Sequence, residues 1–207
     1  MSALFFHLGL ERSSTQSVTG VSNGPVLIWG VSSSFGSISS QFAHDAGYKV
    51  VGVASGKHKE LALSSGVAAF VDRTSPTAIQ ELVALGPFKA VLAAADSAED
   101  QVKIGEILAA QGGGTFLSTM GVREGVKLPE GVTGYFRQFL DDYLDPKNNE
   151  FTRWVWWDYF EQAFREGKLK SVPLDILGGL NEVPRAWELL RSGDVSGKRL
   201  IIMPDRD

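Results

Sequence analysis

The sequence predicts an α/β fold with a doubly wound, mostly parallel sheet that helices cover on both faces. Short apolar runs alternate with amphipathic segments between Pro25 and Ser118, and glycine-containing turns separate them. The first run, Val26–Trp29, is apolar at every position, which is typical of a strand buried on both faces. The chain has 207 residues, of which 43% are hydrophobic, enough for one domain with a large core.

The elements alternate regularly in the first half of the chain. The helix after Val26–Trp29 is predicted from apolar residues at spacings of three and four, which form one stripe. These residues are Phe35, Ile38, Phe42 and Ala46. Gly47 then stands where a left-handed C-cap is expected. Further strands are expected at 49–54, 68–71, 89–95 and 115–118, and further helices at 58–65, 76–84 and 99–110.

The alternation stops near Gly121. Residues 122–149 contain prolines, glycines and an acidic loop, and no strand is predicted there. An aromatic helix at 151–165 is interpreted as core or interface, with the wall of a pocket for a flat apolar substrate as the alternative. A strand at 172–177, a helix at 182–191 and a strand at 198–203 complete the chain. The domain division is a linker helix and polar loop at 1–24, then the α/β domain at 25–207.

Composition excludes several classes of protein. The formal charge of -4 gives no basic face for nucleic acid, so no nucleic-acid partner is expected. Without cysteine there are no disulfides, thiolate nucleophiles or iron–sulfur clusters. His7 and Glu11 have metal-ligand spacing, but Gly9 lies between them and a loop follows, so no metal is expected. No run reaches the roughly 18 apolar residues of a membrane span, and no cationic leader is present, so a cytoplasmic protein with no membrane partner is expected.

The loop between the first strand and its helix, GVSSSFG at 30–36, has the character of a phosphate-binding turn. Backbone N–H groups at a helix N-terminus favour an anion. Gly30 would allow a tight exit from the strand and Gly36 a close approach of helix and strand. Ser33 replaces the usual middle glycine, and its hydroxyl would add a phosphate ligand. The alternative is an ordinary turn without a ligand. The candidate residues are Gly30, Ser32, Ser33, Ser34, Phe35 and Gly36.

The tip of the second strand predicts which dinucleotide is preferred. NAD sites usually carry an acid there for the ribose hydroxyl, whereas this strand ends in Ala54 and Ser55. Lys57 and Lys59 follow and could bind a 2′-phosphate, which predicts NADP(H). The alternative is that both lysines only solvate the start of the next helix.

Two later strand ends are expected to face the nicotinamide half of a dinucleotide, because ligands lie outside the carboxyl ends of parallel strands. One strand end carries Asp96 and Ser97. For Asp96 the alternative is that it is the N-cap of the next helix, and this alternative is favoured. The other is the loop Ser118–Gly121. Tyr143 and Lys147 have the Tyr-x-x-x-Lys spacing of short-chain dehydrogenases, but Pro146 prevents the helix this motif needs, so the match is rejected.

Taken as a set, five stretches resemble the cofactor-binding half of the medium-chain dehydrogenase/reductase superfamily, nearest to zinc-less quinone oxidoreductases and fungal enoyl-reductase-like proteins. They are VLIWGVSSSFG, GVASGKHKELALSSGVAAFVDR, AVLAAADSAED, GGGTFLSTMG and the tail at 167–204, which resembles the family's C-terminal return segment. The resemblance implies a Rossmann-type domain. It also implies roles in cofactor binding. Ser33, Ser34 and Phe35 would hold the pyrophosphate, and Ser55 and Lys59 the 2′-phosphate, while Arg73 would lie beside the adenine, where its guanidinium could stack or reach the phosphate. The residues expected near the nicotinamide ribose are Ala95, Asp96, Ser118, Met120 and Gly121, and those expected to close over the cofactor are Ser196 and Lys198.

The family's N-terminal catalytic domain has no counterpart in this sequence, so a fragment or a stand-alone cofactor module is expected and no catalytic residue is assigned. The favoured function is an NADPH-dependent oxidoreductase that transfers hydride to a small-molecule acceptor, namely an activated alkene, quinone or carbonyl compound. The alternative is an NADP(H)-binding module, or a structural remnant, without turnover. The resemblance also implies a homodimer formed by edge-strand pairing.

Overall fold

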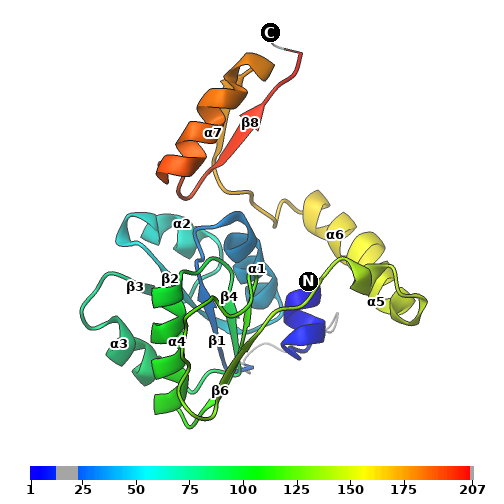
Figure 1. Ribbon diagram of the computed structural model, residues 1–207. Coiled ribbons are helices and arrows are strands. Elements are labelled where there is room, and N and C mark those ends of the chain that lie inside the picture. Colours follow the sequence, from blue (N-terminus) through cyan, green and yellow to red (C-terminus); the bar gives the residue numbers. More distant parts are fainter. Residues whose placement is uncertain (13–22, 206–207) are drawn as a thin grey trace.

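The computed structural model describes residues 1–12 and 23–205, so most of the polar loop expected before the first strand lies outside the described residues. Six parallel strands form one sheet in the order β3-β2-β1-β4-β5-β6 (Figure 1). The strands run outward from β1 in both directions, which is the doubly wound Rossmann-type arrangement. The predicted fold class is therefore confirmed.

The elements of this sheet lie close to their expected positions. The strands are β1 (Pro25–Trp29), β2 (Lys49–Ala54), β3 (Ala69–Asp72), β4 (Ala90–Ala93), β5 (Gly114–Ser118) and β6 (Val132–Tyr135). The helices are α1 (Ser34–Asp45), α2 (Lys59–Ser64), α3 (Ala78–Leu85) and α4 (Ala98–Ala110). Short turns of other helix types lie at η2 (Gly56–His58), η3 (Asp141–Tyr143), η4 (Pro146–Asn148) and η6 (Leu180–Glu182).

The edge strand β6 is absent from the sequence prediction. Its residues are Val-Thr-Gly-Tyr, of which only Val132 is buried, so no apolar run marks it. Gly134 was interpreted as a turn signal, yet it lies within the strand. A Cβ at Gly134 would come within 2.5 Å of the Phe116 ring, so the glycine makes room for a core side chain of the neighbouring strand.

Alternate side chains of the central strands fill two cores, one on each face of the sheet. Val26 and Ile28 point into the core that α1 covers, together with Phe42 of that helix. Leu27 and Trp29 point into the core that α3 and α4 cover. These four side chains of β1 are at most 1% exposed, as a strand covered on both faces requires.

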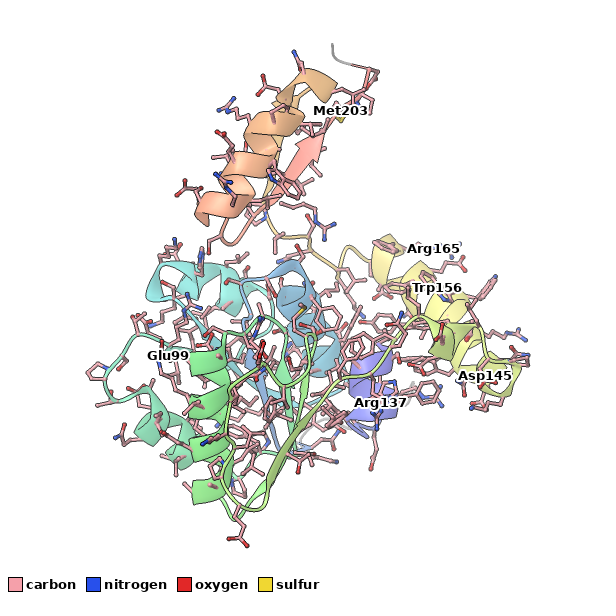
Figure 2. The ribbon with its side chains drawn as sticks, in the orientation of Figure 1. Glu99, Arg137, Asp145, Trp156, Arg165 and Met203 are labelled. Atoms are coloured by element: carbon pink, nitrogen blue, oxygen red, sulfur yellow. The ribbon has the colours of Figure 1, made fainter. Side chains whose placement is uncertain are left out.

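The aromatic segment packs beside the sheet as one helical run. It consists of α5 (Asn149–Arg153), the π-helix η5 (Trp154–Tyr159) and α6 (Phe160–Arg165). It contacts the N-terminal π-helix η1 (Ala3–His7) through the rings of Phe6 and Phe151, whose centroids are 4.3 Å apart. Trp156 lies on its outer surface (Figure 2). The segment therefore belongs to the packing of one face, as favoured from the sequence.

The return segment forms a small unit of its own. Strand β7 (Leu174–Gly178), helix α7 (Val183–Ser192) and strand β8 (Arg199–Ile202) follow one another, and β7 pairs with β8 in a separate parallel sheet. Figure 1 shows this unit standing apart from the six-stranded sheet, on the side of α2. Trp187 of α7 is 69% exposed. Across residues 1–12 and 23–205, none of the helices combines the length and apolar character that crossing a bilayer needs.

Candidate functional site

A cleft of about 340 Å³ lies at the carboxyl ends of β1 and β2, where several separate parts of the chain meet. We call it the strand-end cleft. Its walls are the β1–α1 loop, the tip of β2, the ends of β3 and β4, and the loop 195–198 of the return segment. The predicted cofactor-binding residues that line it are Gly30, Ser32, Ser33, Ser34, Ser55, Arg73, Ala95, Ser196 and Lys198.

Two glycines of the β1–α1 loop are required by the geometry. Gly30 has φ +82°, and a Cβ there would lie 2.6 Å from the carbonyl oxygen of Ala95. A Cβ at Gly36 would overlap the carbonyl group of Gly30. The first glycine therefore turns the chain out of β1 and the second lets α1 approach it, as the sequence predicts.

The hydroxyl group of Ser33 has a different role from the expected one. It accepts a hydrogen bond from the Gly36 N–H at 2.9 Å and donates one to the Gly30 carbonyl oxygen at 2.8 Å. Ser33 is thus the N-cap of α1, and its hydroxyl is engaged within the loop rather than directed at a phosphate.

The backbone of the same turn remains able to donate. Within residues 1–12 and 23–205, the N–H groups of Ser32, Ser34 and Phe35 have no acceptor. Ser34 and Phe35 open the 12-residue helix α1, where the helix dipole favours negative charge. Ser32 and Ser34 also line the strand-end cleft. Backbone amides, and not the Ser33 hydroxyl, are therefore the anion-binding groups that we infer for this turn.

Near the tip of β2, the structure brings the predicted Arg73 into the cleft, but not the two lysines that were expected to bind the 2′-phosphate. Ser55 lines the cleft, whereas Lys57 and Lys59 are exposed and do not. His58 and Arg73 line it instead. The pKa of His58 is lowered, first by burial and then by the nearby positive charges of Lys57 and Arg73.

A carboxylate also lies beside this tip, although β2 itself carries none. Asp72 ends β3, and the register pairs it with Ala54 at the end of β2. Its carboxylate accepts hydrogen bonds from the Thr74 N–H at 2.9 Å and the Thr74 hydroxyl at 2.8 Å. Together with the Gly56 N–H, these donors lower the pKa of Asp72. Asp72 therefore fixes the loop that follows β2.

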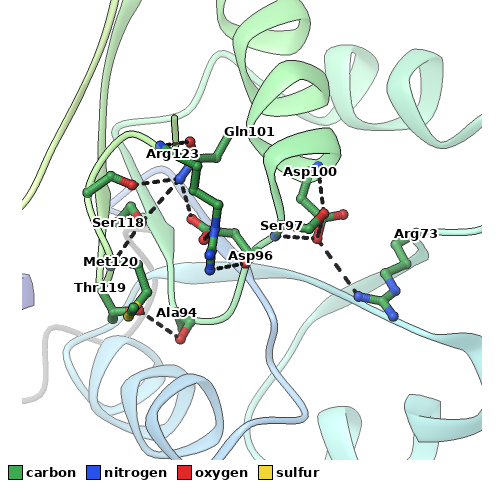
Figure 3. Close-up of polar contacts among 11 residues, drawn as sticks. Arg73, Ala94, Asp96, Ser97, Asp100, Gln101, Ser118, Thr119, Met120 and Arg123 are labelled. Atoms are coloured by element: carbon green, nitrogen blue, oxygen red, sulfur yellow. Dashed lines mark hydrogen bonds and ion pairs between the residues drawn. The ribbon is translucent and has the colours of Figure 1, made fainter. Parts of the chain in front are cut away.

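Asp96 is held in a polar network behind the cleft (Figure 3). Its side chain is fully buried, and Arg123 Nε lies 3.2 Å from Oδ1 while Gln101 Nε2 donates to Oδ2 at 3.1 Å. The expectation that Asp96 caps the next helix is wrong, because Ser97 is the N-cap of α4 and forms a capping box with Asp100. Ala95 lines the cleft and Asp96 does not.

The loop after β5 joins the same network and does not line the cleft. The Ser118 hydroxyl accepts from the Met120 N–H at 3.1 Å, and the Gly121 carbonyl oxygen accepts from Gln101 Nε2 at 2.8 Å. Figure 3 shows this loop close to Asp96 and Arg123. A role for Ser118, Met120 and Gly121 at the nicotinamide remains a prediction.

Three other sequence patterns lie elsewhere. Tyr143 and Lys147 belong to different short turns, and the Lys147 ammonium pairs with Asp145 at 2.7 Å, so the short-chain motif is not formed. His7 bonds to Asp142 at 2.7 Å and does not meet Glu11 in a cluster. Among the described residues, no group of three or more His, Asp or Glu side chains could hold a metal ion. The aromatic segment does not line the strand-end cleft.

The sheet order, the glycine turn at β1 and the cleft at the strand ends together define a Rossmann-type dinucleotide-binding domain with a C-terminal return segment. The chain is 32% identical to the trans-enoyl reductase himH from Aspergillus japonicus over 180 residues. Its fold matches a quinone oxidoreductase from Pseudomonas syringae pv. Tomato (TM-score 0.65, 17% identity, 90% of this chain and 59% of that one). It also matches CurA from Vibrio vulnificus, solved in complex with NADPH (TM-score 0.65, 14% identity, 99% and 61%).

These similarities identify the chain as a relative of the fungal trans-enoyl reductases in the medium-chain dehydrogenase/reductase superfamily. The alignment with himH covers 86% of this chain and 51% of that protein, so the chain spans about half the length of the curated relatives it matches. No protein-family model matches the sequence.

Proposed function

We propose that this chain binds NADP(H) in the strand-end cleft and forms the cofactor-binding part of an oxidoreductase of the zinc-less medium-chain type. The observation that carries the proposal is the turn at 32–35, where unpaired backbone amides meet the N-terminus of α1 at the mouth of the cleft. A dinucleotide's diphosphate is the anion that such a turn holds in Rossmann-type domains. The likeness to trans-enoyl reductases supports the same conclusion.

The residues present fit a dinucleotide. Gly30 and Gly36 leave no space for side chains between the loop and the strand ends, so the backbone itself faces the cleft. Ser32, Ser34 and Arg73 also line the cleft and carry hydroxyl and guanidinium donors. The site is thus built from donors and small residues, which suits a phosphate-bearing ligand.

The choice of NADP(H) over NAD(H) is supported by Arg73. Its side chain is 49% exposed and lines the cleft, and its ion pair with Asp100 is long, at 3.9 Å, so the guanidinium could turn toward a 2′-phosphate. Asp72 could oppose a phosphate, but its oxygens already accept from Thr74 and Gly56. Neither Asp72 nor Asp100 lines the cleft, whereas Arg73 does, and this favours binding of a 2′-phosphate.

A bound nicotinamide would supply the hydride chemistry, and the chain's residues would bind and orient it. The amides of Ser34 and Phe35 would hold the diphosphate, and Ala95 would leave room beside the ribose. For the acceptor we propose a small activated alkene, quinone or carbonyl compound, since similar proteins are named enoyl reductases and quinone oxidoreductases. A binding module without turnover is the second candidate, because the chain spans about half of its relatives.

Calorimetric titration with NADPH and NADH tests the proposal. The unmodified chain is expected to bind NADPH more tightly than NADH. Arg73→Ala should weaken NADPH binding by about 10- to 100-fold, the value of a charge-assisted bond, and NADH binding by less than about threefold. Arg165→Ala, a surface arginine that pairs with Glu161 on α6, is the matched control and should change neither. An equal loss for both nucleotides would refute the assignment of Arg73.

Turnover separates the two candidate functions. Absorbance of NADPH is followed with a panel of enones, quinones and aldehydes. Oxidation of NADPH supports an enzyme, whereas saturable binding without oxidation supports the binding module.

We also propose a homodimer through β6, whose outer edge has no strand partner among the described residues. Sedimentation at the mass of one 22.4 kDa chain would contradict it.

A further inference from the structure

The return segment is attached to the Rossmann-type domain at two points. At its start, the backbone of Lys170 exchanges hydrogen bonds of 2.8 and 2.9 Å with the side-chain amide of Gln41 in α1. At its far loop, the Ser196 hydroxyl lies 2.7 Å from His58 Nε2. The second contact lies at the strand-end cleft, because His58 and Ser196 both line it.

The backbone beside Ser196 is shaped to fit the imidazole. Gly197 has φ +70°, and a Cβ there would lie 2.6 Å from both Cε1 and Nδ1 of His58. Only glycine therefore lets the loop approach the ring this closely. His58 itself comes from η2, directly after the tip of β2. The His58 imidazole therefore comes from the tip of β2 and contacts the loop 195–198.

We propose that His58 is a positioning residue that holds the loop 195–198 over the strand-end cleft, so that docking of the return segment and binding of a dinucleotide are coupled. The identity of the ligand rests on the proposed function, but the His58–Ser196 contact is present in the free chain. The coupling has two sides. A ligand that contacts both the strand ends and the loop 195–198 stabilises the docked loop. A loop that is already docked can contact the ligand without a further loss of conformational entropy.

The charges around His58 favour a neutral ring. Lys57 on the same turn and Arg73 after β3 are the nearest positive charges, and both oppose protonation of the imidazole. Asp72 faces the same turn, with its carboxylate bound to Thr74 and Gly56. Lys198 on the loop pairs with Asp175 at 2.7 Å within the return segment. The contact is a hydrogen bond between a neutral ring and the uncharged Ser196 hydroxyl, so a neutral amide of similar reach should replace the imidazole.

The experiment measures amide hydrogen exchange of residues 195–198 in the free chain, and NADPH affinity by calorimetry, for five variants. His58→Ala and Ser196→Ala should each speed exchange of the loop by about 3- to 10-fold, the value of one net hydrogen bond. NADPH binding should weaken by a similar factor. The double variant should be no worse than either single one, since both remove the same contact. His58→Gln should restore most of the protection, and His44→Ala, an exposed histidine of α1, should change nothing.

Exchange at 195–198 that is unchanged in His58→Ala would overturn the proposal, as would additive effects in the double variant. Failure of the proposed function has a different signature. In that case NADPH binds no variant, including the unmodified chain, while the exchange data still show that His58 holds the loop. If NADPH binds tightly but amide exchange of residues 195–198 is unchanged in His58→Ala, the proposed function stands and the coupling is refuted.

Discussion

Gly36 shows how one missing side chain brings α1 against β1. Its backbone is helical, and in an ordinary helix alanine is more stable than glycine by about 0.5–1 kcal/mol. Here a Cβ would overlap the Gly30 carbonyl, which is backbone and cannot move aside cheaply. Gly36→Ala should therefore lower the free energy of unfolding by about 1–3 kcal/mol, as overpacking does. Denaturant titration measures it, and a more stable variant would contradict the packing described.

Ser33 allows the helix cap and the anion site to be separated. Ser33→Ala removes the cap of α1 and should cost about 1 kcal/mol of stability, with NADPH binding largely kept because the amides of the turn remain. Ser33→Asp keeps an oxygen for the Gly36 N–H but adds a negative charge beside the proposed diphosphate site. Its stability should therefore approach that of the unmodified chain.

Binding of NADPH to Ser33→Asp should be lost, at least 100-fold by calorimetry, through repulsion between like charges. Ser97→Asp, at the cap of α4 outside the strand-end cleft, is the matched control and should leave NADPH binding unchanged. Undiminished binding in Ser33→Asp would place the diphosphate elsewhere.

At the scale of elements, the polar network around Asp96 joins β4, α4 and the loop after β5. Arg123→Ala would leave the buried Asp96 carboxylate without its positive partner and should lower stability by about 1.5–3 kcal/mol. Asp96→Asn in the same background should recover part of the loss. Arg165→Ala breaks only a surface pair and should stay within about 0.5 kcal/mol. Thermal and denaturant unfolding of the four chains measures this, and equal effects of the two arginine changes would show that the network is not needed.

Elements whose pattern is local could be predicted from the sequence. The strand at 49–54 matches β2 residue for residue, because the run of valine, glycine and alanine at 50–54 lies between the turn glycines Gly47 and Gly56. Strand β6 could not be predicted, since its glycine and its single buried residue are explained only by the Phe116 ring of the adjacent strand. Packing between distant segments decided that element.

The candidate site also contains residues that could be predicted from the sequence and residues that could not. Gly30 and Gly36 were predicted, because their role depends on one turn. The roles of Asp72 and His58 could not be, since Asp72 approaches Gly56 only through the pairing of β3 with β2, and His58 reaches the cleft while its neighbours Lys57 and Lys59 point to solvent. Residue type alone does not predict which side chain of a short turn faces the cleft and which faces solvent. The ion pair of Asp96 could not be predicted either, because its partner Arg123 lies 27 positions away.

At the scale of the whole molecule, the strand-end cleft joins the six-stranded domain to the return segment, whose loop 195–198 lies at the carboxyl ends of the strands. The loop 195–198 and the turn at 30–34 are distant in sequence and line the same cavity. Apolar side chains of the return segment remain exposed, Trp187 and Leu190 of α7 among them. The chain spans about half the length of its curated relatives. Nucleotide binding is therefore the activity that we propose for this chain itself.

The measurement that tests this account most directly is a ¹H–¹⁵N NMR titration of the chain with NADPH. We predict saturable shifts at the amides of Ser32, Ser34 and Phe35, where the diphosphate would accept hydrogen bonds, and accompanying shifts at residues 195–198. Shifts confined to other parts of the chain, with these amides unmoved at saturation, would contradict it.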